Sequence, residues 1–206
     1  MKVILVNGSP HLKGTTYRAL QEIQKSLEEN GVETRIYQLG AKPISGCIGC
    51  GVCYKTGKCF MDDKVNEFVE LAKEADGFIF STSVHYAAAT GSITSFLDRV
   101  FYSGGIHLAY KPAASVITAR RAGTSATFDQ MNKYITINNM PLVSSNYWNA
   151  VHGLDAEDAQ KDIEGMQTMR ILGDNMAWML KCIELGKQNG INPPEIQKRT
   201  ATNFIR

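Results

Sequence analysis

Apolar residues in this chain gather in short continuous runs that alternate with stretches of helical spacing. The first run, residues 2–7 (KVILVN), is rich in β-branched side chains and ends at a Gly-Ser-Pro turn, which predicts a buried parallel strand. Similar runs predict further strands at residues 32–38, 78–82, 113–119 and 141–144. The run at residues 32–38 is weaker and alternating, which is typical of an outer strand.

Between these runs, apolar residues recur every three or four positions, which is the period of a helix. In the first such stretch Thr15 or Thr16 can cap the helix, and Asn30-Gly31 can end it. Further helices are predicted at residues 64–73, 92–101 and 124–137, and a long helical segment is predicted at residues 156–187.

The alternation of strands and helices predicts an α/β fold, in which a parallel sheet is covered by helices on both faces. The chain shows no repeat or linker, so we expect one domain over residues 1–206. A cysteine-rich loop at residues 46–60 and a C-terminal helical extension at about 156–206 belong to it. Ligands of such sheets bind beyond the carboxyl ends of the strands. The loops after the first, third and fourth strands are therefore the candidate site.

Charge and composition argue against some classes of binding partner. The 22 basic and 20 acidic residues give a net charge of +2, and no basic run with interleaved aromatic residues indicates nucleic-acid binding. The N-terminal run is too short for a signal peptide, and no stretch approaches the roughly 18 apolar residues of a membrane span. We therefore expect a cytoplasmic protein with neither a nucleic-acid nor a membrane partner. Clustered cysteines in that compartment indicate metal binding or redox chemistry.

The loop after the first strand, NGSPHLKGTT, joins a buried strand to the start of a helix. Helix N-termini carry unpaired N–H groups and partial positive charge, and Ser9, Thr15 and Thr16 add hydroxyl groups, which favours a phosphate site. The loop lacks both the GxxxxGK[ST] and the GxGxxG patterns of nucleotide-binding proteins. The alternative is that these residues serve only the turn and the helix cap.

The other two loops offer groups that suit a flat ring. The loop that starts at Ser83 has small residues beside His85 and Tyr86, and the loop after the fourth strand carries Arg120 and Arg121. An arginine can stabilise negative charge on a reduced flavin. The alternatives are that Tyr86 is a surface aromatic residue and that the arginines are solvated or contact another subunit.

Together, the segments GSPHLKGTT, SVHYAAATGSITSFLDR and ARRAGT resemble the NADPH-dependent FMN reductase superfamily. With the cysteine motif between them, the chain is most similar to the iron–sulfur flavoprotein branch. The resemblance implies a flavodoxin-like, doubly wound sheet of five parallel strands in the order 2-1-3-4-5. Relatives often carry Pro-Val-Tyr where this chain has Ser83, Val84 and His85.

The same resemblance implies which residues bind FMN. It assigns the phosphate to the first loop, at Ser9, His11, Thr15 and Thr16. It assigns the isoalloxazine ring to the middle loop, at Val84, His85, Tyr86 and Ala87. It closes the other side of the ring with Thr118, Arg121 and Gly123.

Four of the five cysteines, Cys47, Cys50, Cys53 and Cys59, form the motif C-x2-C-x2-C-x5-C. Four thiolates are the usual ligands of a [4Fe-4S] cluster, and the first three follow ferredoxin spacing. The longer last gap resembles the iron–sulfur flavoprotein motif, in which all four cysteines serve one cluster. A zinc site, a redox thiol pair and an unligated loop remain alternatives.

The last helical segment offers a buried face. Met166, Met169, Met176 and Met179 recur at helix-face spacing, which predicts a core or interface stripe. Cys182 lies in the same segment and is predicted to be an ordinary core cysteine.

These observations predict an FMN-dependent NAD(P)H oxidoreductase that passes electrons to a small-molecule or protein acceptor, with the cluster as a second carrier. No catalytic side chain is expected, because the flavin carries the chemistry. The alternatives are an electron-transfer flavoprotein and a redox sensor. The resemblance implies that a flavodoxin-type carrier would be strongly acidic, unlike this chain. It also implies a homodimer or homotetramer.

Overall fold

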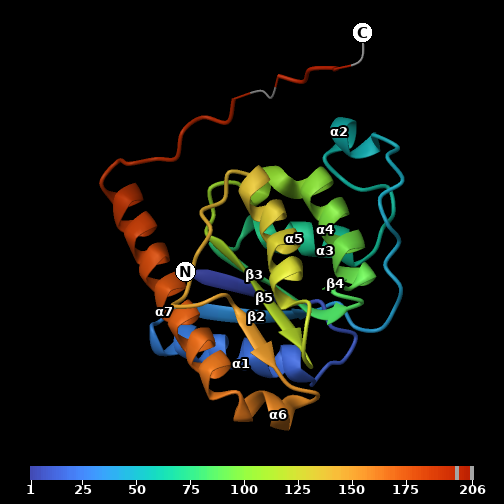
Figure 1. Ribbon diagram of the computed structural model, residues 1–206. Helices are drawn as coiled ribbons and strands as arrows, with labels where there is room; N and C mark the ends of the chain where they lie inside the picture. The colour runs from blue at the N-terminus through green and yellow to red at the C-terminus, as the bar shows by residue number, and fades with distance from the viewer. Residues whose placement is uncertain (198–199, 205–206) are drawn as a thin grey trace.

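The computed structural model describes residues 1–197 and 200–204 and centres on a parallel sheet (Figure 1). The strands in sheet order are β2 (Glu33–Gln38), β1 (Lys2–Asn7), β3 (Gly77–His85), β5 (Ala113–Ala119) and β6 (Ala150–His152). A two-residue strand, β4 (Ala88–Ala89), pairs antiparallel with the end of β3. Counted along the chain, the parallel strands have the order 2-1-3-4-5. The predicted flavodoxin-like α/β fold is confirmed.

Helices cover both faces of this sheet. The helices are α1 (Thr15–Glu29), α2 (Val52–Thr56), α3 (Lys64–Lys73), α4 (Gly91–Gly104), a 3-10 turn η1 (Gly105–His107), α5 (Thr124–Ile137), α6 (Ala156–Lys161) and α7 (Ile163–Gln188). The α1 and α7 helices pack on one face, while α3, α4 and α5 pack on the other. None of the helices in the described part of the chain is both long and apolar enough to cross a membrane.

The central strand β3 supplies both cores because alternate residues of a strand point to opposite faces. Phe78 and Phe80 enter the core beneath α3, α4 and α5, whereas Ile79 enters the core beneath α1 and α7. The same alternation continues into the polar end of the strand. Thr82 therefore faces α4, where its hydroxyl accepts a hydrogen bond from the Thr90 backbone N–H, and Ser83 faces α1.

The prediction of a last strand at residues 141–144 is wrong. Leu142 forms only an isolated bridge with Ala113, and the strand that pairs with the end of β5 is β6. Between the two, the buried Asn149 side chain donates to the Ser115 carbonyl at 3.1 Å and so takes the place of a strand partner. The edge strand is thus interrupted, and its longer half lies later in the chain than expected.

The C-terminal helical segment is two helices, because the chain turns at Asp162 between α6 and α7. The Asp162 carboxylate accepts hydrogen bonds from Gly165 N–H at 3.0 Å and from His152 N–H at 2.7 Å. Residues 198–199 and 205–206 of the predicted extension lie outside the described residues.

The predicted methionine stripe of α7 is confirmed as core. Met166, Met169 and Met176 are buried, and Met179 packs against them half-buried. Cys182 is exposed, so the prediction of a core cysteine is wrong. The reason is its position, since the last buried residue of the stripe in α7 is Leu180.

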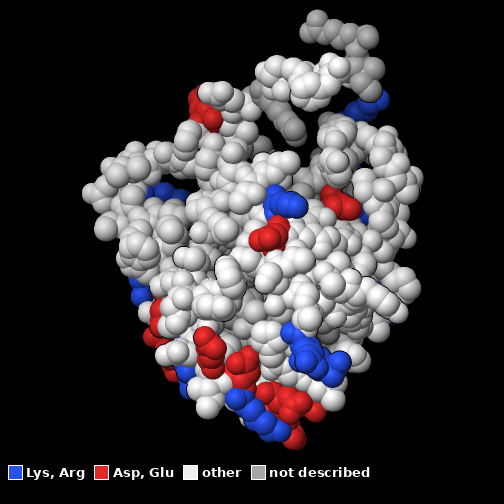
Figure 2. All heavy atoms as spheres, in the orientation of Figure 1, with Lys and Arg blue, Asp and Glu red and all other residues white. Residues whose placement is uncertain are grey.

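Charged side chains of both signs are interspersed on the face shown in Figure 2, most densely over α6 at its lower edge. Neither sign forms an extended patch on this face, in keeping with a net charge of +2.

Candidate functional site

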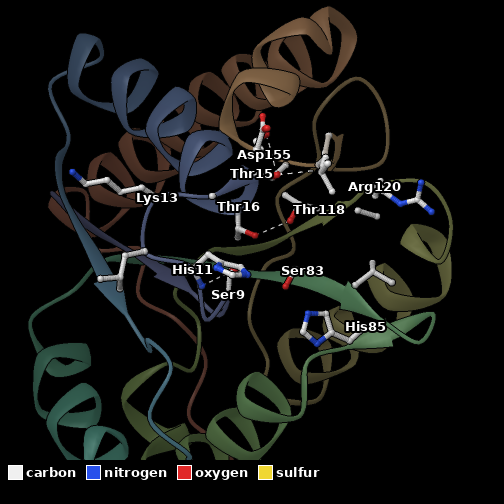
Figure 3. A pocket seen from close by; sticks show the side chains of 16 residues that line it. Ser9, His11, Lys13, Thr15, Thr16, Ser83, His85, Thr118, Arg120 and Asp155 are labelled. Atoms are coloured by element: carbon white, nitrogen blue, oxygen red, sulfur yellow. Dashed lines mark hydrogen bonds between the residues drawn. The ribbon is translucent and has the colours of Figure 1, made fainter.

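A cleft of about 630 Å³ opens at the carboxyl ends of β1, β3 and β5 (Figure 3). Its volume lies within the roughly 300 to 1,000 Å³ of small-molecule and cofactor sites. From the first loop it is lined by Ser9, His11, Thr15 and Thr16, the four residues assigned to the phosphate. From the strand ends it is lined by Val84, His85 and Thr118, which were assigned to the ring. Residues 153–155, after β6, close the remaining side.

The N-terminus of α1 forms one end of the cleft. Its N-cap is Gly14, which provides no side-chain cap, and its first turn contains no acidic residue. Thr15 and Thr16 therefore do not cap the helix, contrary to the prediction, but lie within its first turn. The N–H groups of that turn remain available to an anion, and the helix dipole favours negative charge there.

Instead of capping the helix, Thr15 and Thr16 form hydrogen bonds with residues at the ends of β5 and β6. Thr15 Oγ1 donates toward the Gly153 and Asp155 carbonyls, at 3.3 and 3.1 Å. Thr16 Oγ1 lies 2.7 Å from Thr118 Oγ1 on β5. These contacts hold the start of α1 against the ends of β5 and β6.

The first loop is fixed by residues that the sequence analysis did not single out. Asn7 Oδ1 accepts from Ser9 N–H at 3.0 Å, and Asn7 Nδ2 donates to Gln38 Oε1 at 2.7 Å. Gly8 is needed because a Cβ there would lie 2.5 Å from the Ser81 carbonyl oxygen. An Asn-Gly pair directly after a buried strand is the sequence signal that would have identified them.

Ser83 is a further cleft residue that sequence reasoning did not assign. Its Oγ is buried without a hydrogen-bond partner, and it is the one such side-chain polar atom found in the described part of the chain. The adjacent Leu12 and Leu154 side chains are apolar, largely exposed and also line the cleft. Polar groups on the floor and apolar groups at the rim suit a ligand with a polar chain and a flat ring.

A tight hairpin at the end of β3 borders this cleft. Its two turn residues, Tyr86 and Ala87, have φ values of 49° and 59°, in the left-handed region that ordinary residues rarely occupy. The Tyr86 side chain is fully exposed, and neither residue lines the cleft. Such strain persists only where surrounding structure enforces it.

The loop after β5 supports this hairpin. Gly123 has a φ of +93°, and a Cβ there would lie 2.7 Å from Ala87 Cα and 2.9 Å from Val84 Cγ1. Gly123 therefore packs behind the cleft and does not line it. Arg120 lines the cleft, whereas the exposed Arg121 does not.

The four clustered cysteines line a second, smaller hollow on the outer side of α4. Cys47, Cys50, Cys53 and Cys59 share a hollow of about 20 Å³, and Cys47 and Cys53 also border an open hollow of about 370 Å³. Burial raises the pKa of the Cys53 thiol, and the other three thiols raise it further. Within residues 1–197 and 200–204, no three potential ligands lie close enough together to hold a single metal ion.

Arg99 of α4 ties this cysteine loop to the body of the protein. Its side chain is almost fully buried and contacts Asp63 at 2.6 Å, and its Nε–H donates to Cys59 Sγ at 3.3 Å. It also donates to the Ser45 and Met61 carbonyls. Burial alone would lower the pKa of Arg99, but Asp63 and Cys59 outweigh it and raise the pKa, so the guanidinium stays charged.

Asn66 of α3 holds the other side of Cys59. Its side chain accepts from the Cys59 N–H at 3.1 Å and donates to the Cys59 carbonyl at 3.0 Å. Cys59 is therefore held on both sides, while Cys47 and Cys50 are exposed.

The sheet order, the uncapped helix N-terminus and the cleft define the class as a flavodoxin-like protein with a ligand site at the strand ends. A model of the NADPH-dependent FMN reductase family matches residues 1–155. The chain belongs to that family and is an oxidoreductase that binds FMN.

Individual relatives agree with this assignment. The chain is 30% identical over 195 residues to an iron–sulfur flavoprotein of Methanocaldococcus jannaschii, covering 89% of this chain and all of the relative. Among solved structures, RosB with a bound riboflavin-phosphate derivative has a TM-score of 0.69 at 14% identity, covering 100% of this chain and 94% of RosB. An NADH:FMN oxidoreductase in its apo form has a TM-score of 0.63 at 16% identity, covering 86% and 89%. At these identities the structural matches show the fold alone.

Proposed function

We propose that this protein takes electrons from NADH or NADPH onto bound FMN and passes them to an acceptor through a second site formed by its cysteine loop. The observation that carries the proposal is the cleft itself. It combines an uncapped helix N-terminus, a hydroxyl-lined floor and an apolar rim at the carboxyl ends of the strands.

The residues of the cleft have separable roles in this proposal. The first turn of α1, with Thr15 and Thr16, binds the FMN phosphate. Arg120 at the rim favours negative charge on the ring, and Leu12 and Leu154 exclude water from it. FMN supplies the redox chemistry when bound, so the protein provides position, charge and a dry wall.

The experiment that tests the flavin chemistry is anaerobic stopped-flow reduction of the FMN-loaded protein by NADH and by NADPH. Bleaching of the flavin absorbance with saturable kinetics supports the proposal, and the two rates give the nucleotide preference. If neither nucleotide reduces the flavin, the protein is a carrier or sensor that does not turn over NAD(P)H.

We further propose that Cys47, Cys50, Cys53 and Cys59 hold a [4Fe-4S] cluster. Support comes from the four thiols around one hollow, the glycines at positive φ among them, and the name of the Methanocaldococcus jannaschii relative. The hollow of about 20 Å³ has room for about one water molecule, so binding a cluster requires the loop to open. Residues 47–50 are exposed, which permits that movement.

Iron, acid-labile sulfide and zinc analysis of anaerobically purified protein tests the cluster. About four irons and four sulfides per chain are expected, the content of one cluster. Cys53→Ser should lose them, whereas Cys182→Ser, a matched change outside the loop, should retain them. Zinc alone, or no metal with full FMN content, would contradict the cluster.

Assembly and location complete the proposal. We infer a homodimer or homotetramer, supported by the exposed side chains of Tyr54 in the cysteine loop and of Tyr102 next to it. Light scattering coupled to size-exclusion chromatography measures the number of subunits.

We infer a cytoplasmic location, because clustered free thiols persist in a reducing compartment. Fractionation of cells that express the tagged full chain tests it.

A further inference from the structure

The buried hydroxyl of Ser83 lacks a partner although it lies in the wall of the cleft. Its Oγ can donate one hydrogen bond and accept two, yet it makes none within the described structure. Buried polar atoms are almost always hydrogen-bonded, and an exception at a binding site points to a ligand.

The strand register places Ser83 relative to the phosphate end of the cleft. Ser83 is the Cα partner of Thr118 in the β3–β5 ladder, so the two side chains point to the same face. Thr118 Oγ1 in turn contacts Thr16 Oγ1 in the first turn of α1. Because β3 lies between β1 and β5 in the sheet, Ser83 stands between the first loop, which follows β1, and Thr118.

Figure 3 shows the same order across the cleft. Ser83 lies between the Thr16–Thr118 pair and His85, which stands at the hairpin beside the rim. A group in that position faces the middle of the ligand. In FMN, the middle is the ribityl chain, whose hydroxyls can both donate and accept hydrogen bonds.

We propose that Ser83 Oγ hydrogen-bonds a ribityl hydroxyl of bound FMN and so fixes the cofactor between its phosphate and its ring. The inference rests on the proposed function, since it requires FMN in this cleft. It adds a cofactor-binding residue at a position where the family resemblance implies none. Cofactor binding gives this hydroxyl a hydrogen-bond partner.

Ligand affinity measured on the apo-protein by flavin fluorescence quenching tests the proposal. The ligands are FMN, riboflavin and lumiflavin, which has the same ring with a methyl group in place of the ribityl chain. The variants are Ser83→Ala and, as a matched control, Ser125→Ala, whose side chain is exposed in α5 and does not line the cleft.

Ser83→Ala should weaken FMN and riboflavin by the same factor, about tenfold, because a ribityl hydroxyl is left unpaired in both complexes. Lumiflavin affinity should not change. The thermal midpoint of the apo-protein should not fall, because the Ser83 hydroxyl makes no hydrogen bond to the described protein atoms. Ser125→Ala should match the wild type throughout.

Four results would overturn the inference. If Ser83→Ala binds FMN as tightly as the wild type, Ser83 does not contact the cofactor. Equal weakening of lumiflavin moves the contact to the ring, and weakening of FMN but not riboflavin moves it to the phosphate. A lowered midpoint of the apo-protein makes Ser83 a structural residue. Wild-type protein that fails to bind FMN would instead overturn the proposed function, so the two failures are distinguishable.

Discussion

At the scale of single residues, the hairpin beside the cleft depends on one glycine behind it. Gly123→Ala should lower the free energy of unfolding by about 3 kcal/mol, since it adds left-handed backbone strain and a Cβ clash with Ala87 and Val84. Urea unfolding of the apo-protein measures this. FMN affinity should fall as well, because Val84 lines the cleft.

Gly190→Ala is the matched control for that substitution. Gly190 has a φ of +81° with nothing within 4 Å of a Cβ placed there. Gly190→Ala should therefore lower the free energy of unfolding only by the cost of backbone strain, about 1 kcal/mol. Equal losses for the two variants would show that the contact between Gly123 and the hairpin contributes no stability.

Single residues also mark how far the sequence could predict the site. Ser9, Thr16 and Thr118 could be assigned because their segments resemble a known family, and all three line the cleft. Ser83 could not be assigned, because an unpaired hydroxyl is recognisable only once its burial and neighbours are known. Tyr86 was expected along the ring, but the turn of the hairpin directs its side chain to solvent.

At the scale of elements, the ion pairs between α1 and α7 centre on one buried carboxylate, beside the apolar contacts that the two helices share. Glu22 accepts from Arg18 and from Arg170 of α7, each at 2.7 Å. Burial raises the pKa of the Glu22 carboxyl, but the hydrogen bonds and charges of Arg170 and Arg18 outweigh it, so its pKa lies below the usual 4.5. The ionised form is therefore favoured by folding.

The sign of the pH dependence follows. A carboxyl with a lowered pKa in the folded state contributes stability above pH 4.5, and that contribution is lost as the pH falls below this value. Glu22→Gln should cost about 1.5 kcal/mol at pH 7 and flatten the fall in thermal midpoint between about pH 5 and 3. Glu29→Gln, at an exposed pair with Lys25, should leave the profile unchanged.

The attachment of the cysteine loop to α4 gives a second prediction at this scale. Arg99→Gln should lower the free energy of unfolding by about 2 kcal/mol, because it breaks a buried ion pair with a partly exposed Asp63. The expected iron content falls too, since Cys59 loses its contact. Lys58→Gln, which removes an exposed pair with Asp62, should cost under about 0.5 kcal/mol. Matching losses would mean that Arg99 does not organise the loop.

The elements themselves were predictable where local signals were strong. Asn30-Gly31 ends α1 as expected, since Gly31 adopts a φ of +78°. The three-residue β6 was missed because it is too short to show a period, and its pairing with β5 joins segments more than 30 residues apart in the chain. The helix α2 was missed for a similar reason, because its five residues lie between two glycines.

At the scale of the whole molecule, the cofactor should act as part of the fold. A ligand that binds only the folded state at a hundred times its dissociation constant adds about 2.7 kcal/mol of stability. For a chain of this length that corresponds to a rise of roughly 5 to 10 °C in the thermal midpoint. Differential scanning calorimetry with added FMN measures the rise. A midpoint independent of FMN concentration would contradict cofactor binding to the native state.

The cleft and the cysteine loop share no lining residue. Thr90, the N-cap of α4, accepts the Ile93 N–H and donates to the Gly8 carbonyl at the start of the first loop. The cysteine loop packs against Asp98, Arg99 and Tyr102 in the second half of the helix. The helix rises about 12 Å from Thr90 to Asp98, so changes in the loop should leave FMN affinity intact. The comparison of Cys53→Ser with the wild type in the FMN titration checks that independence.

Cys182 is a site for selective chemical labelling of the molecule. It is exposed on α7, on the opposite side of the molecule from α2 in Figure 1. When the four sulfurs of the loop are bound to iron, the fifth is the one left to react with a maleimide. A spin label or fluorophore can then be attached at a single known position of the natural chain, and the spacing between copies in solution can be measured from it.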